Sequence, residues 1–117
     1  MTETADPVDA ARGQYRALVV AWDEASDHPK VANRISDAIH VLYKQLRGSE
    51  TGRLAISGLL SDPVTAVRLF AANHSLAWDQ SRAESALEAI QQEVSLHAVT
   101  AKYTLLSFRK GTLNLNW

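Results

Sequence analysis

The sequence predicts an all-α fold of about six antiparallel helices. Apolar residues recur at spacings of three and four along most of the chain, which is the period of a helix with one buried face. No stretch of alternating apolar and polar residues is long enough to indicate a sheet. The connections between the periodic segments are short, as is typical of antiparallel helices that neighbour one another.

Length and composition restrict the kind of protein that this chain can be. Its 117 residues match the usual size of one domain, so residues 1–117 are expected to form a single helical domain. Twelve basic residues against 13 acidic ones give a formal net charge of −1, which disfavours a general nucleic-acid partner. The absence of cysteine excludes disulfides, thiolate metal sites and cysteine nucleophiles.

The same sequence lacks the signals of export and of membrane insertion. Residues 1–6 are acidic rather than basic, and no apolar core of a signal peptide follows them. No segment reaches the roughly 18 apolar residues that a membrane-spanning helix needs. We therefore expect a cytoplasmic bacterial protein with no membrane partner.

The first two helices are predicted from prolines and apolar spacing. Asp6 precedes Pro7 at a typical helix start, and the apolar positions that follow predict a helix over residues 6–23. A break at residues 27–29 is followed by a broad apolar stripe that ends at Gly48, a typical helix stop.

Two further helices occupy the middle of the chain. Residues 51–60 predict a short third helix, in which Gly52 and Gly58 each lower helix stability by about 1 kcal/mol relative to alanine. Pro63 follows a capping aspartate and predicts the first position of a fourth helix, which continues to Trp78. This helix is apolar nearly all round, so we expect it to be the central and most buried one.

The last two helices have capping residues at their starts. A fifth helix begins after Asp79 or Ser81 and is expected to bury the apolar residues Ala83, Ala86, Leu87, Ile90 and Val94. A sixth begins at Ser95 and stops at Lys110-Gly111. Its apolar positions at helical spacing are Leu96, Val99, Tyr103 and Leu106, with Ala98, Leu105 and Phe108 beside them.

The start of the fourth helix carries a resemblance to a known class of repeat. Asp62-Pro63-Val64-Thr65-Ala66-Val67-Arg68-Leu69-Phe70-Ala71-Ala72 resembles HEAT and armadillo-type repeats, in which a loop with Asp and Pro precedes a helix bearing Val-Arg and close-packed alanines. Together with Ala32-Asn33-Arg34, Leu59-Leu60 and residues 83–90 and 101–111, it makes residues 30–113 similar to a bacterial family of short HEAT-like helical proteins of unknown function.

That resemblance implies a small α-α superhelix of about three helix pairs, with the N-terminal helix outside the matched region. It also implies that Arg68 pairs with an acidic group in an adjacent loop.

No pattern of residues in the sequence indicates catalysis. The histidines at 28, 40, 74 and 97 lie far apart and lack the spacing of metal ligands, so we expect neither a metal nor another cofactor. His74 lies in the apolar fourth helix, where a hydrogen-bonded core histidine is expected. No serine stands in a nucleophile elbow. We expect a binding protein, not an enzyme, and assign no catalytic residue.

Charge is distributed along the chain in blocks. Four acidic residues and one basic residue lie between Asp79 and His97, and three basic residues follow in 98–117. Such blocks indicate either charge pairing between solvated helices or a patch that is complementary to a charged partner. Tryptophan is enriched among the residues that anchor protein interfaces, so two tryptophans join the acidic residues as candidates. The candidate protein-binding residues are Trp78, Asp79, Glu84, Glu88, Gln91 and Trp117. An alternative basic patch consists of Arg34, Lys44 and Arg47.

Stacked HEAT-like helices usually work by binding, so we expect the partner to be another protein. Our leading hypothesis is an immunity protein that inhibits a cognate bacterial toxin by direct binding, with the acidic residues of the fifth helix mimicking a polyanion. One alternative is a nucleic-acid-binding HEAT-like module that uses the basic patch together with Arg53 and Lys102. Another is a self-associating scaffold, for which an exposed apolar face on the first or sixth helix would be the mark.

Overall fold

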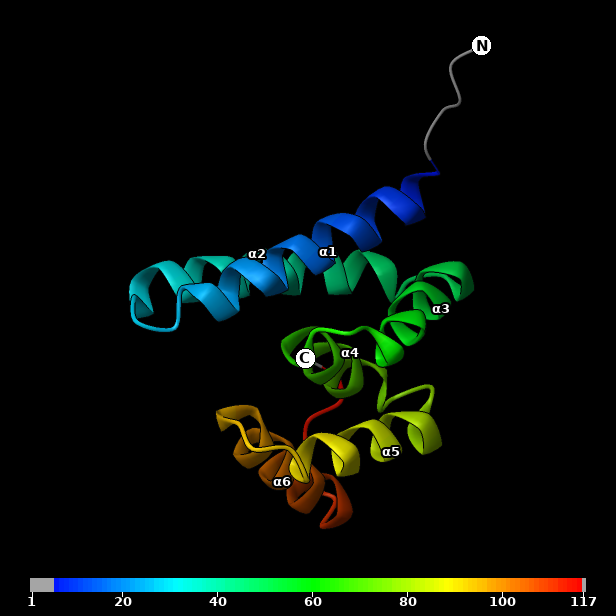
Figure 1. The fold of residues 1–117 in the computed structure, drawn as a ribbon. Coiled ribbons are helices and arrows are strands. Elements are labelled where there is room, and N and C mark those ends of the chain that lie inside the picture. The colour runs from blue at the N-terminus through cyan, green and yellow to red at the C-terminus, as the bar shows by residue number, and fades with distance from the viewer. Residues whose placement is uncertain (1–5, 117) are drawn as a thin grey trace. The chain divides into compact units, whose positions relative to one another are not determined.

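The computed structural model describes residues 6–116 and shows an all-α fold, which confirms the predicted fold class (Figure 1). Six α-helices and one short 3₁₀ turn lie within the described residues. They are α1 (Pro7–Glu24), α2 (Pro29–Leu46), α3 (Glu50–Gly58), η1 (Leu59–Ser61), α4 (Thr65–Ser75), α5 (Gln80–Gln91) and α6 (Leu96–Arg109). None of these helices is long and apolar enough to cross a membrane.

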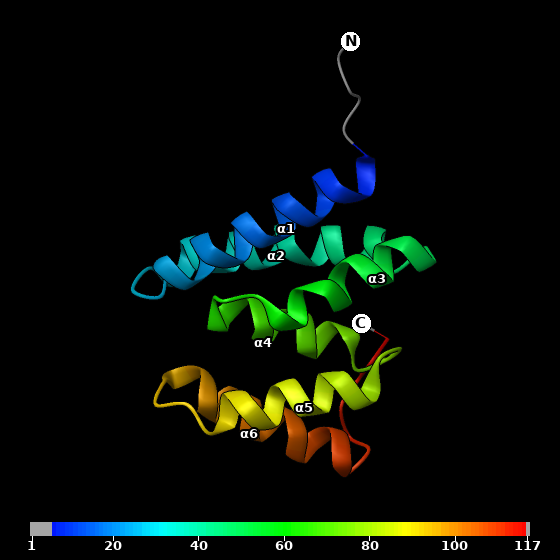
Figure 2. The ribbon, with the colours of Figure 1, turned by 45° about the vertical axis from the view of Figure 1, so that its right-hand side comes forward.

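Contacts within the chain divide it into two compact units. The N-terminal unit covers residues 1–56 and holds α1, α2 and most of α3, whereas the C-terminal unit covers residues 57–117 and holds η1, α4, α5 and α6 (Figure 2). The single domain and the HEAT-like superhelix remain predictions.

In the N-terminal unit, α1 begins as the sequence predicts and packs along α2. Pro7 lies at the start of the helix, and the side chain of Asp6 accepts a hydrogen bond from the Val8 N–H at 2.9 Å. Tyr15 of α1 is fully buried, and this burial, with a smaller contribution from Tyr43, raises the pKa of its phenol well above the ordinary value. Tyr15 therefore stays neutral and serves as a core residue.

The turn from α2 into α3 depends on a glycine. A Cβ atom added to Gly52 would lie 1.9 Å from the backbone oxygen of Leu46, far closer than van der Waals contact. The Gly52 N–H also donates to the Ser49 Oγ at 3.0 Å. Gly58, at the end of the same helix, has open space around the equivalent position. Of the two glycines that weaken α3, packing requires only Gly52.

In the C-terminal unit, α4 begins later than the sequence predicted. Pro63 is not the first helical residue, because Val64 is extended, with φ −87° and ψ 121°, and the helix starts at Thr65. Asp62 does not cap the helix, because its Oδ1 accepts a hydrogen bond from the Val64 N–H at 2.9 Å, in the loop before the first turn. The helix also ends at Ser75 rather than Trp78, where the Ser75 carbonyl accepts the Asp79 N–H at 2.7 Å in a turn leading to α5.

The prediction that α4 is the central helix is confirmed for the C-terminal unit. It contacts η1, α5 and α6. His74 is only 3% exposed and lies edge-on to the Phe70 ring, as expected of a core histidine. Small side chains let the neighbouring helices approach closely. The buried residues of α4 are Ala66, Val67, Leu69, Ala71, Ala72, His74 and Ser75.

The orientation of α6 is the main difference from the expected packing. Ala101 and Leu105 are the buried residues of this helix, so a small side chain and a leucine one turn apart form its inner face. Val94, expected in the core, is fully exposed because α5 ends at Gln91 and Val94 belongs to the following loop. The predicted stop of α6 is confirmed, since Gly111 has a φ of +73°, which favours glycine.

The two glycines of α3 provide a matched test of this packing. Gly52→Ala forces a methyl group against the backbone of α2 and should lower the free energy of unfolding by about 1–3 kcal/mol. Gly58→Ala adds a methyl group into open space and should raise it by about 0.4–1 kcal/mol. Urea denaturation followed by circular dichroism measures both variants. Equal effects of the two substitutions on the free energy of unfolding would contradict the close approach of Gly52 to the Leu46 backbone.

Candidate protein-binding surface

The outer face of α6 carries an exposed row of large apolar side chains. Leu96, Val99, Tyr103 and Leu106 are exposed to 87%, 54%, 61% and 43% of their surfaces. Spacings of three, four and three residues place them on one side of the helix, opposite Leu105. We call these four residues the apolar stripe of α6.

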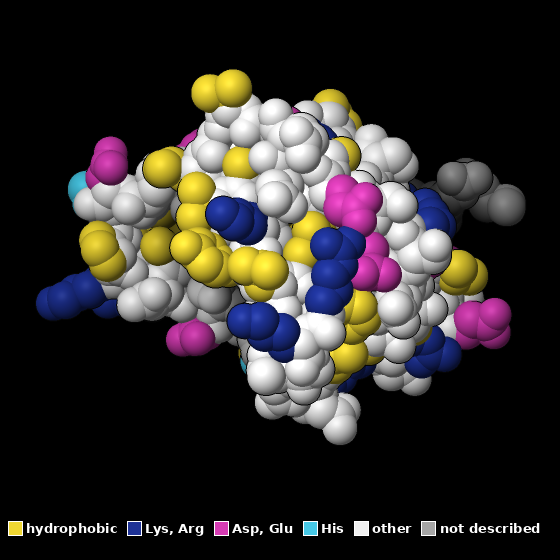
Figure 3. Space-filling view, turned by 90° about the horizontal axis from the view of Figure 1, so that it is seen from below, with side chains coloured by type: hydrophobic (Ala, Val, Ile, Leu, Met, Phe, Trp, Pro, Cys, Tyr) yellow, Lys and Arg dark blue, Asp and Glu magenta, His cyan; other side chains and the backbone are white. Residues whose placement is uncertain are grey.

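Exposed apolar residues are concentrated at this place in the chain. Of the eight large hydrophobic residues exposed within the described part, Val94 and the four of the apolar stripe lie between positions 94 and 106. Figure 3 shows apolar side chains on one face with basic side chains among them and acidic ones beside some of these. Contiguous apolar patches on the scale of a few hundred Å² mark interaction sites more often than scattered single residues do.

The charged residues of α6 itself, and of the turn that ends it, are all basic. Residues 94–110 contain Lys102, Arg109 and Lys110 and no acidic residue. Lys102 and Lys110 are exposed, and neither makes an ion pair with any residue that the structure describes. The face therefore combines apolar anchors with two lysines whose charge is available to a partner.

Arg109 is occupied by the acidic residues of α5. Its Nε donates to the Glu84 Oε1 at 3.4 Å, and its Nη2 donates to the Glu88 Oε1. The hydrogen bond to Glu88, with a smaller contribution from that to Glu84, raises the pKa of Arg109. These contacts correspond to the pairing between helices that the charge blocks suggested. They also reduce the negative charge that α5 offers to a partner.

Two of the other sequence-predicted binding residues, Asp79 and Trp78, have internal contacts as well. Asp79 pairs with Arg82 at 3.1 Å. The Trp78 Nε1 donates to the Ser57 Oγ at 3.1 Å, so the polar end of the indole is bonded within the C-terminal unit. Gln91 is partly buried at the end of α5. Trp117 lies outside the described residues. The structure thus groups Glu84 and Glu88 around Arg109 and holds Asp79 at the opposite end of α5.

The alternative basic patch on α2 does not converge on one point. Arg34 and Lys44 are exposed but ten residues apart, which corresponds to about 15 Å along a helix. The Arg47 guanidinium lies over the Tyr43 ring at 4.8 Å from its centroid. The Arg47 carbonyl in turn accepts a hydrogen bond from Arg53 at 2.8 Å. Two of the five residues considered for nucleic-acid binding are therefore engaged in local packing.

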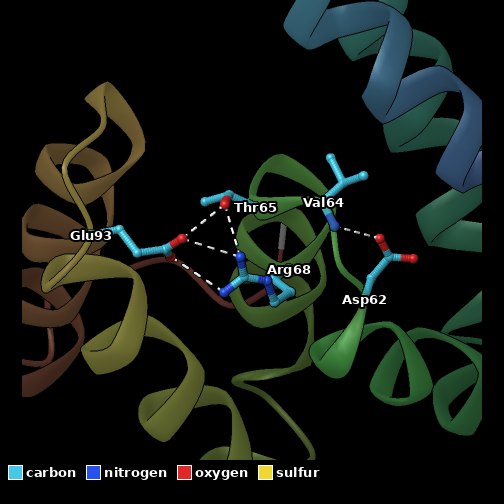
Figure 4. Close-up of polar contacts among 5 residues, drawn as sticks. All are labelled: Asp62, Val64, Thr65, Arg68 and Glu93. Atoms are coloured by element: carbon cyan, nitrogen blue, oxygen red, sulfur yellow. Dashed lines mark hydrogen bonds and ion pairs between the residues drawn. The ribbon is translucent and has the colours of Figure 1, made fainter.

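An ion pair fixes the loop that leads into α6 (Figure 4). Arg68 of α4 donates from Nη1 to the Glu93 Oε2 at 3.3 Å and from Nη2 to the Glu93 Oε1 at 3.2 Å. Thr65 completes the set, since its Oγ1 accepts from Arg68 at 2.8 Å and donates to Glu93 at 3.0 Å. The expectation that Arg68 pairs with an acidic residue of an adjacent loop is confirmed.

These contacts also determine the protonation of Glu93. The hydrogen bond from Arg68 is the largest influence and lowers the pKa of the Glu93 carboxyl below its ordinary value, against a smaller opposing effect of burial. A glutamate is ionised at neutral pH in any case, and these contacts keep Glu93 ionised to a lower pH than usual. It precedes Ser95, the residue before α6, by only two positions, so the ion pair positions the start of the helix that carries the apolar stripe.

Within the described residues no group of three or more histidine, cysteine, aspartate or glutamate side chains is arranged to hold a metal ion. Comparison of the chain with known protein families, with curated proteins and with solved structures found no match. The resemblance to HEAT-like proteins therefore remains a prediction, and the candidate surface is defined by its own chemistry.

The ion pair between Arg68 and Glu93 predicts a pH-dependent contribution to stability. Because folding lowers the pKa of Glu93, this contribution is present above the ordinary glutamate pKa and is lost as the pH falls through the folded value. A double-mutant cycle of Arg68→Ala and Glu93→Gln should show a coupling of about 0.5–1 kcal/mol at pH 7 for this partly exposed pair.

The same cycle at pH 3 should show a smaller coupling, measured by urea denaturation in both buffers. Glu24→Gln, at an exposed carboxylate in α1, is the control and should not couple to Arg68→Ala. A coupling that stays constant between the two pH values would contradict the assigned ion pair.

Proposed function

We propose that this chain is a protein-binding module that docks its partner on the apolar stripe of α6. The observation that carries the proposal is the exposure of four large apolar side chains, all on one side of a helix whose other side is already packed. Tyr103 is the central residue of the stripe and is 61% exposed. Aromatic residues of this kind are enriched among those that contribute most to binding energy.

A protein partner fits this surface better than a nucleic acid does. Nucleic-acid interfaces require several basic side chains directed at phosphates. The centre of this face is apolar, and of the three basic residues in 94–110 Arg109 is paired with Glu84 and Glu88, which leaves Lys102 and Lys110. An apolar centre with a polar edge is the usual composition of a protein interface.

The narrower form of the proposal is an immunity protein that binds and inhibits a cognate bacterial toxin. In the sequence, this hypothesis rested on acidic residues of α5 that would mimic a polyanion. Two of them, Glu84 and Glu88, are bound to Arg109, which weakens the support for contact through α5. The apolar stripe of α6 therefore replaces α5 as the surface through which we propose that inhibition occurs.

Self-association is a second candidate, because the apolar stripe is also the mark expected of a scaffold that binds copies of itself. Light scattering at two protein concentrations separates the candidates. A mass that stays at one chain favours a different protein as partner, and a mass that rises to two chains favours self-association.

The proposal is tested with the proteins encoded beside this chain in its genome. Isothermal titration against each of these products should identify one that binds, and co-expression should show that binding relieves any toxicity. Val99→Glu in the apolar stripe should weaken that binding at least about tenfold, since a charge would be desolvated in the interface.

A matched control is available because Val41 of α2 is exposed to 55% and Val99 to 54%. Val41→Glu should leave binding within about twofold of the unmodified chain. Circular dichroism should show both variants folded. Binding that survives Val99→Glu and is lost with Val41→Glu would reject α6 as the docking surface.

A further inference from the structure

We propose that the partner presents an amphipathic helix whose apolar side packs on the apolar stripe of α6 and whose edges are acidic. This inference rests on the proposed function and specifies the chemistry of the partner. It is carried by the spacing of the apolar residues and by the charges beside them.

The spacing fits a second helix. Leu96, Val99, Tyr103 and Leu106 follow one another at intervals of three, four and three, the pattern with which two helices interdigitate side by side. Leu106 lies ten residues after Leu96, so the stripe is about 15 Å long, which corresponds to nearly three turns of a partner helix. Most of the opposite side of α6 faces its own unit through Ala101 and Leu105, so the stripe is the side left for docking.

The charges beside the apolar stripe determine which residues we expect along the edges of the partner helix. Lys102 lies three residues after Val99 and four before Leu106, so it stands beside the stripe on the helix surface. Lys110 follows Leu106 by four residues and extends the stripe beyond its last apolar position. With no acidic residue between 94 and 110, acidic side chains on the partner would complement these lysines without competition from α6 itself.

A second copy of this chain fits the same surface less well. Pairing two copies of α6 through their stripes would bring the basic edges of both helices together, and like charges in contact disfavour the pairing. The carboxylates of Glu84 and Glu88, which could have offset this repulsion, are already bound to Arg109.

Two designed helical peptides test the inference against the full chain. Both carry the same leucine stripe, and one has glutamate at the edge positions whereas the other has lysine. Fluorescence anisotropy should show that the glutamate peptide binds about tenfold more tightly than the lysine peptide at low salt. This preference should shrink as the ionic strength rises.

Charge reversal gives the decisive variant. The pair Lys102→Glu and Lys110→Glu should invert the preference, so that the lysine peptide binds more tightly. The control pair Lys30→Glu and Lys44→Glu, at exposed lysines of α2, should leave the preference unchanged.

Other results would overturn the inference. Equal binding of both peptides, or binding of neither, rejects an acidic partner helix. The inference is also rejected if light scattering shows a mass that doubles with concentration, and if the Val99→Glu variant stays at the mass of one chain. A second copy would then occupy the stripe. Binding to vesicles of phosphatidylserine and phosphatidylcholine, lost in Val99→Glu, likewise rejects it in favour of a lipid surface.

The failure of this inference is distinguishable from failure of the proposed function. If neither peptide binds but a neighbouring gene product binds and is sensitive to Val99→Glu, the docking surface stands and only the acidic helix is rejected. If that gene product binds and Val99→Glu has no effect, the proposed docking surface is rejected as well.

Discussion

The ion pair between Arg68 and Glu93 is the contact on which the candidate surface depends. It joins the central helix of the C-terminal unit to the loop between α5 and α6, and Thr65 bridges both partners. A loop held at one point by three polar groups has less freedom than a loop held by backbone alone. Because α6 begins three residues after Glu93, this restraint limits where the start of the helix can lie, and the packing of Ala101 and Leu105 decides which side meets the core.

The packing of α6 explains why so much apolar surface is left outside. Ala101 and Leu105 occupy the inner side, and the small alanine lets the helix lie close to its neighbours. The four larger side chains of the apolar stripe then have no core to enter within the described residues of their own unit. An arrangement that exposes Leu96 and Tyr103 while burying Ala101 is poor for stability alone and suits a surface that a partner covers.

Sequence reasoning predicted the helices well and the binding surface poorly, for identifiable physical reasons. Asp6-Pro7 and Gly111 act through local backbone geometry, so the start of α1 and the end of α6 could be read directly. The burial of α4 followed from its composition. Periodicity shows which residues of α6 share a side, but this helix is apolar on two sides, and only packing decides between them.

The predicted acidic surface on α5 shows the same limitation. The blocks of charge allowed both an internal pairing and a patch for a partner, and sequence alone does not bring Arg109 next to Glu84 and Glu88. The close approach at Gly52 was equally inaccessible, because it depends on where the Leu46 backbone lies in space. Sequence patterns within one helix predict that helix, whereas contacts between helices decide which side chains remain exposed to a partner.

The orientation of α6 is tested most directly by thiol labelling, since the chain contains no cysteine of its own. Single variants Val99→Cys and Leu105→Cys place one thiol on each side of the helix, and their rates of reaction with a maleimide are compared with those in urea. We predict that Val99→Cys reacts in the folded chain nearly as fast as in urea, whereas Leu105→Cys is slowed more than about a hundredfold. Slow labelling at position 99 together with fast labelling at position 105 would contradict the account.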